Sequence, residues 1–174
     1  MSSRSQPRTD ESQGTSLRGQ PIVVSPVPVV ARISPLGYHD FASQFLRAAR
    51  AVVLSDRPFS PVACFLVCQS IELSLKAFLL IHHVPKPELK SLGHDLVKLL
   101  SRAQSLDLGA LVSPTAEQQR EVQAANRYYK GNVLRYFEVT EAVTGYEHKP
   151  RLEVLLSVAS ALVETLGQPC LSAT

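Results

Sequence analysis

The chain has 174 residues, of which 45% are hydrophobic and 19% are charged. This length suits one domain with a tail, and the composition excludes a fully disordered chain, a collagen-like chain and a small disulfide-stapled protein. The net charge is +3, and the first 35 residues contribute four arginines and two acids to it. Because the remainder is then almost neutral, we do not expect a protein that coats nucleic acid with its whole surface.

Residues 1–33 are rich in Ser, Arg, Gln and Pro, which predicts a disordered tail. The apolar stretch at 21–31 contains three prolines, which disfavour the helical core of a secretion signal. We therefore expect a cytoplasmic protein in a reducing environment. The apolar stretch at 61–81 is interrupted by Gln69, Glu72 and Lys76, so we expect no membrane span.

Two helices with the same start signal are predicted first. The Ser-Pro pair at 34–35 supplies a cap and a first-turn proline, and the apolar spacing after it predicts a helix over about 36–54. A second Ser-Pro pair at 60–61 precedes a segment that is apolar nearly all round and extends to about residue 82. A helix that is apolar on every face is typical of the centre of a bundle.

Three more helices are predicted in the rest of the chain. One begins near residues 93–95, with leucines on one face, and the next opens at 113–115 and reaches about residue 130. An irregular stretch at 132–148 follows. The last helix starts at Lys149-Pro150, and we expect Gly167 and Pro169 to end it.

Five helices with short connections and no strand-turn-strand pattern predict an all-α fold, a compact bundle. We place its domain at 34–168 and a C-terminal tail at 169–174.

The sequence lacks the glycine-rich phosphate loops, the serine-hydrolase elbow and the zinc-protease motif. Cys64, Cys68, His82 and His83 do not share one face of a helix, so they are a poor zinc set, and the two cysteines are more typical of a core. We predict no metal and no cofactor.

Charges inside the apolar central helix are candidates for a site. Glu72 and Lys76 are spaced i,i+4, which predicts an ion pair within the helix. Charges there are costly unless they are paired or face a cleft, and we favour a structural role over a ligand-facing one. His94, between Gly93 and Asp95, either belongs to a helix cap or hydrogen-bonds near the Glu72 face.

The segment at 126–137 (NRYYKGNVLRYF) interleaves basic and aromatic residues. Such residues can bind phosphates and stack on bases, so the candidates for phosphate and base contact are Arg127, Tyr129, Arg135 and Tyr136. In the alternative interpretation the tyrosines pack in the core and the cations are solvated. Spacing alone favours neither.

Three motifs in this order resemble proteins of the HEPN domain family: SIELSLKAFL at 70–79, GHDL at 93–96 followed by Leu99, and the tyrosine and arginine pairs within 128–136. The resemblance covers about residues 38–166. It implies a compact α-helical bundle, often dimeric. The family includes many RNases of toxin and defence systems, and also non-catalytic modules that bind RNA or nucleotides.

Catalytic members of this family carry an arginine and a later histidine with four to six residues between them, and two protomers form a composite, metal-independent site. Here Arg127 and Arg135 lie in the expected region, but the next histidine is His148, which is too far along. Arg32 and His39 have the spacing but lie at the start of the first helix. The resemblance therefore implies that the standard ribonuclease motif is missing.

We predict a cytoplasmic, homodimeric, HEPN-like module that is non-catalytic and binds RNA, a nucleotide or a partner protein in a regulatory, defence or toxin–antitoxin setting. Glu72, Lys76 and His94 would form the polar floor of its cleft. The first alternative is a divergent metal-independent ribonuclease, with Arg135 stabilising phosphate charge and His94 as general acid or base. The second is a purely structural protein-interaction bundle.

Overall fold

The computed structural model describes residues 34–53, 60–134 and 149–173. Within these ranges it contains six α-helices, one short 3₁₀ helix and no strand, which confirms the predicted all-α class. The elements are α1 (Pro35–Val53), α2 (Pro61–Ile81), α3 (Lys86–Leu92), α4 (Leu96–Gln104), η2 (Leu108–Ala110), α5 (Ala116–Lys130) and α7 (Leu152–Ser172). The predicted tail at 1–33 and most of the predicted irregular stretch lie outside the described residues.

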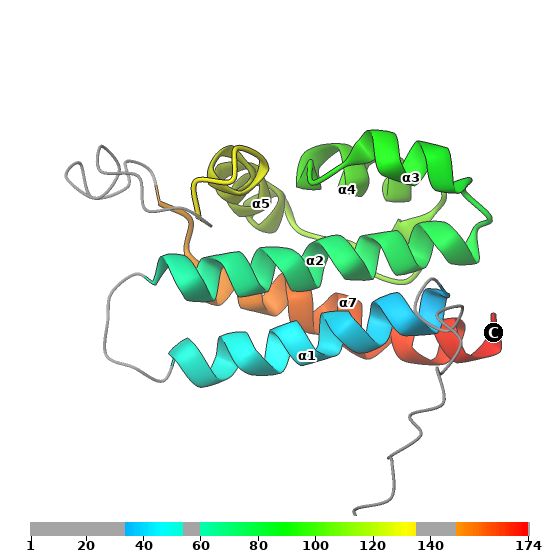
Figure 1. Cartoon of the computed structure of the whole chain (residues 1–174), viewed down its shortest axis with the longest axis horizontal. Helices are drawn as coiled ribbons and strands as arrows, with labels where there is room; N and C mark the ends of the chain where they lie inside the picture. Colours follow the sequence, from blue (N-terminus) through cyan, green and yellow to red (C-terminus); the bar gives the residue numbers. More distant parts are fainter. Residues whose placement is uncertain (1–33, 54–59, 135–148, 174) are drawn as a thin grey trace, which may run out of the picture.

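Helix α2 is the centre of the bundle, with α1 and α7 along one side and α3, α4 and α5 on the other (Figure 1). It begins where the sequence predicts, because the Ser60 Oγ accepts a hydrogen bond from the Ala63 N–H at 3.2 Å and Pro61 fills the first turn. Most of its residues are buried, in agreement with its apolar faces.

Small and polar side chains tie α1 to its two neighbours. The Ser70 hydroxyl donates to the Ala42 carbonyl oxygen at 2.8 Å, and both residues are fully buried. The His39 Nε2 lies 2.8 Å from the Val163 carbonyl oxygen, a distance that fits a hydrogen bond in which the Nε2–H donates to that oxygen. This histidine, the one with the family's Arg–His spacing, therefore serves the packing of α1 on α7.

Two helix boundaries differ from the prediction. The proline-rich segment after α2 starts the additional helix α3, because Pro87 in its first turn lacks only an N–H that would have no partner in the helix. The predicted end at Gly167 and Pro169 is wrong, since α7 continues to Ser172. Burial of Leu166 and Cys170 outweighs the local helix-breaking tendency, so most of the segment predicted as a C-terminal tail is helical.

The three cysteines are all buried, which confirms the core position predicted for Cys64 and Cys68. The neighbouring Cys64 thiol, together with burial, raises the pKa of Cys68, and burial raises the pKa of Cys170 to about 11. Thiols in such surroundings behave as small apolar groups.

Helices α2 and α7 are long and apolar enough to cross a membrane by length and composition. In the bundle, 61% of the most apolar window of α2 and 33% of that of α7 are buried. Core helices of soluble proteins have the same composition, and the central position of α2 accounts for its apolar character.

Candidate functional site

A buried carboxylate, that of Glu72 on α2, lies where α2 meets α5 and the start of α4. Its side chain is only 3% exposed. Three side chains contact it: the Lys76 Nζ at 2.7 Å, the His94 Nδ1 at 2.9 Å and the Tyr129 hydroxyl at 2.5 Å. A buried carboxylate needs such donors, and we call these four residues the Glu72 cluster.

The Glu72 cluster holds His94 in one orientation. The Nδ1–H of its ring donates to the carboxylate, while its side chain is 47% exposed. The other ring nitrogen, Nε2, has no hydrogen-bond partner within the described residues. An imidazole that is oriented by a carboxylate on one side and open on the other can exchange a proton or bind an anion.

A second cluster joins α4 to α5. Asp95 is the N-cap of α4: its Oδ1 accepts from the Lys98 backbone N–H at 3.2 Å and from the Asn126 Nδ2 at 3.0 Å, and its Oδ2 accepts from the Lys130 Nζ at 2.7 Å. The Asn126 Oδ1 accepts from the Leu96 N–H at 2.8 Å. The first N–H groups of α4 are therefore satisfied partly by α5, which fixes the two helices relative to each other.

Burial by itself would raise the pKa of Asp95. Hydrogen bonds from the Lys130 ammonium, the Lys98 N–H and Asn126 stabilise the charged form more strongly, so the pKa lies below its ordinary value of 3.8. Asp95 is therefore ionised near neutral pH, and both of its carboxylate oxygens accept hydrogen bonds, at the position next to His94 in the chain.

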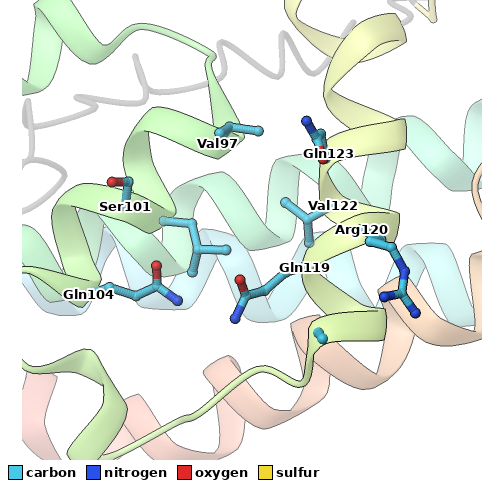
Figure 2. A pocket seen from close by; sticks show the side chains of 9 residues that line it. Val97, Ser101, Gln104, Gln119, Arg120, Val122 and Gln123 are labelled. Atoms are coloured by element: carbon cyan, nitrogen blue, oxygen red, sulfur yellow. The ribbon is translucent and has the colours of Figure 1, made fainter.

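A groove runs between α4 and α5. Its narrower part has a volume of about 360 Å³ and is shown in Figure 2, and its wider, shallower part has a volume of about 730 Å³. Val97 and Gln123 line both parts, so we treat them as one α4–α5 groove.

Most polar groups in the narrower part are uncharged. Figure 2 shows the side chains of Gln104 on α4 and Gln119 on α5 extending toward each other, whereas the guanidinium of Arg120 points away from α4; Ser101 and Gln123 also line this part. These hydroxyl and amide groups are exposed hydrogen-bonding partners above an apolar floor.

The wider part of the groove is cationic. Among the described residues, Lys98, Arg127 and Lys130 line it together with one carboxylate, that of Asp95, which Lys130 already binds. Lys98 and Arg127 are exposed and have no ion pair within the described residues. Two positive charges at this end are therefore not neutralised by neighbours in the described parts of the chain.

The acidic residues of α5 lie on another face of that helix. Glu117 and Glu121 both accept hydrogen bonds from Arg151, which precedes α7, at 2.6 Å and 2.9 Å. Their negative charge is therefore directed toward α7 and away from the groove.

The structure brings together some of the predicted site residues. Glu72, Lys76 and His94 meet, and both the predicted ion pair and the hydrogen bond that the sequence left open are present. Tyr129 joins them, but it is 2% exposed, so its ring packs in the core and is not available to stack on a base. Arg127 lies at the wider part of the groove.

Arg135, Tyr136 and His148 lie outside the described residues. Sequence reasoning missed Lys98 and Asn126, which the structure places at the same end of the groove. Nothing in their spacing marks them, because their proximity depends on how α4 crosses α5.

Within the described residues, no three His, Cys, Asp or Glu side chains are grouped so that they could hold a metal ion.

We predict that Glu72→Gln lowers the free energy of unfolding by on the order of 3 kcal/mol, because it leaves the mostly buried Lys76 ammonium without its counter-charge. Tyr129→Phe removes one hydrogen bond to the carboxylate and should cost about 2 kcal/mol. Urea unfolding followed by circular dichroism measures both.

Glu88→Gln, which breaks the more exposed pair with Arg102, is the control and should cost less than about 1 kcal/mol. Equal losses in all three variants would contradict a central role for Glu72.

The lowered pKa of Asp95 predicts an acid-sensitive contribution to stability. A carboxyl group whose folded pKa lies below its unfolded pKa stabilises the fold above the unfolded value, and this contribution is lost as the pH falls through the folded pKa. Asparagine keeps the helix cap but not the charge, so Asp95→Asn should cost about 1 kcal/mol near neutral pH. The difference between wild type and variant should shrink as the pH falls below 3.8 and through the lowered folded pKa of Asp95. A difference that stays constant over this range would show that the charge contributes nothing.

Comparison with known proteins places this arrangement in a family. A family model described as the HEPN domain matches residues 40–168, a span that includes both clusters and the α4–α5 groove. A search of curated proteins and a search of solved structures returned no match. Because the family model matches well over half of the chain, this protein belongs to the HEPN domain family.

Proposed function

We propose that this HEPN domain is a non-catalytic RNA-binding module whose α4–α5 groove takes a single-stranded segment. The observation that carries the proposal is the pair of unneutralised cations, Lys98 and Arg127, at the wider part of the groove. Phosphate contacts from such residues supply most of the affinity in sequence-independent nucleic-acid binding. HEPN domains are often linked to ribonuclease or toxin–antitoxin roles, which supports RNA as the ligand.

The groove supports recognition of the backbone more than of base sequence. Its lining contains amide and hydroxyl groups, such as Gln119 and Ser101, that can hydrogen-bond a ribose 2′-hydroxyl. The described residues that line it include no aromatic side chain, and Tyr129 is buried against Glu72. We therefore expect weak sequence preference and a strong dependence on salt concentration.

The second candidate function is a divergent ribonuclease, and one observation favours it. The His94 side chain is 47% exposed while the Glu72 carboxylate holds its Nδ1, and the next residue, Asp95, lines the groove. A histidine so placed could take the proton of a 2′-hydroxyl as general base. The missing Arg–His spacing favours the non-catalytic module.

Family membership also supports a homodimer in the cytoplasm, acting in a defence or toxin–antitoxin setting. These points belong to the proposal and are separate from the groove, which lies within one chain.

We predict that Lys98→Gln and Arg127→Gln each weaken binding of a fluorescent single-stranded RNA of about 12 nucleotides by roughly fivefold to tenfold at low salt, through loss of a charged phosphate contact. Each should also reduce the slope of log affinity against log salt by about 0.7. Fluorescence anisotropy measures both quantities.

Arg102→Gln is the matched control, because this arginine is on α4 but pairs with Glu88 and does not line the groove. Equal weakening by the control would show general charge attraction and contradict the groove as the site. The same RNA would also be incubated with the protein without added metal. Cleavage by the wild type that is lost in His94→Ala would favour the ribonuclease, whereas RNA that stays intact would support the non-catalytic module.

A further inference from the structure

We infer a second binding site, for a small phosphorylated ligand, in a pocket between α1, α2 and α3. This lysine pocket has a volume of about 250 Å³ and is lined by Tyr38, Lys76, Leu80, Lys86, Leu89 and Lys90. It shares no lining residue with the α4–α5 groove. The inference is therefore independent of RNA binding by that groove.

Three positive charges meet around this small volume. Lys86 and Lys90 are spaced i,i+4 on α3, where two like charges repel each other. Neither has an ion-pair partner within the described residues, and the nearest acid on that helix, Glu88, is bound to Arg102 at 2.7 Å. An anion in the pocket would relieve this repulsion and neutralise both groups.

Lys76 is the least exposed of the three lysines that line the pocket. Its side chain is only 13% exposed, and its ammonium already contacts Glu72 at 2.7 Å. Because an ammonium group has three N–H donors, it can keep that contact and still donate to a phosphate oxygen. A charge-assisted hydrogen bond is stronger at such a partly buried position than at the open surface.

The other walls of the pocket select the rest of the ligand. Leu80 and Leu89 are apolar, Leu89 is buried, and the Tyr38 ring stands beside them. The volume is below the range usual for drug-sized ligands. This combination fits one phosphate group attached to a small apolar or aromatic body, and it is too small for a polymer.

The position of Lys76 also connects the two regions of the molecule. A ligand phosphate that accepts a hydrogen bond from the Lys76 ammonium changes the electrostatic surroundings of Glu72, which in turn binds the His94 ring. Occupation of the lysine pocket should therefore be felt at the His94 ring, on the other side of the carboxylate.

The experiment is a titration of the full chain with phenyl phosphate, with phenol and inorganic phosphate as comparisons. Nuclear magnetic resonance follows the methyl groups of Leu80 and Leu89 and the ring of His94. We expect phenyl phosphate to shift all three, to bind more tightly than inorganic phosphate, and to bind roughly tenfold or more weakly to the double variant Lys86→Gln, Lys90→Gln.

Lys98→Gln is the control, because it removes a lysine that belongs to the α4–α5 groove, and phenyl phosphate should bind it as tightly as wild type. Two results would overturn the inference: equal affinity for the wild type and the double variant, or phenol shifting the leucine methyls as much as phenyl phosphate does. Loss of RNA binding in Lys98→Gln with phenyl phosphate binding intact would confirm that the two sites are separate.

Discussion

The burial of one carboxylate is the constraint on which this structure depends. Glu72 lies in the most apolar helix of the bundle, where an ionised group without partners would be very costly. Its partners are Lys76 on α2 itself, His94 two residues before α4, and Tyr129 on α5, so the requirement to satisfy Glu72 draws both outer helices onto the core. The groove between α4 and α5 is a consequence of where these contacts place the two helices.

Some charged side chains join one helix to another, and others are exposed at the groove and at the lysine pocket. Asp95 and Asn126 fix the start of α4 against α5, and Arg151 forms ion pairs with the acids of α5 on another face. Exposed cations that have no ion pair within the described residues include Lys98 and Arg127 at the groove, and Lys86 and Lys90 at the lysine pocket. Structural carboxylates with partners, beside cations without them, are a distribution suited to phosphate-containing ligands.

Sequence predicted the features that depend on local signals. The caps at Ser60 and Thr115 and the apolar faces of the helices act over one or two turns, so the starts of α2 and α5 and the all-α class could be predicted. The end of α7 could not, because the burial of Cys170 is decided by distant packing. For the same reason Tyr129 could not be assigned to the core, nor Lys98 and Asn126 to one groove, since they meet only across a helix crossing.

The account's central claim is that single-stranded RNA lies in the α4–α5 groove, and cross-linking tests it most directly. RNA that carries a photoreactive uridine analogue would be irradiated with the full chain, and the cross-linked peptides would be identified by mass spectrometry. The account predicts cross-links within residues 96–104 and 116–130, the two helices that line the groove. Efficient cross-linking to α1 or α7, with none to α4 or α5, would contradict it.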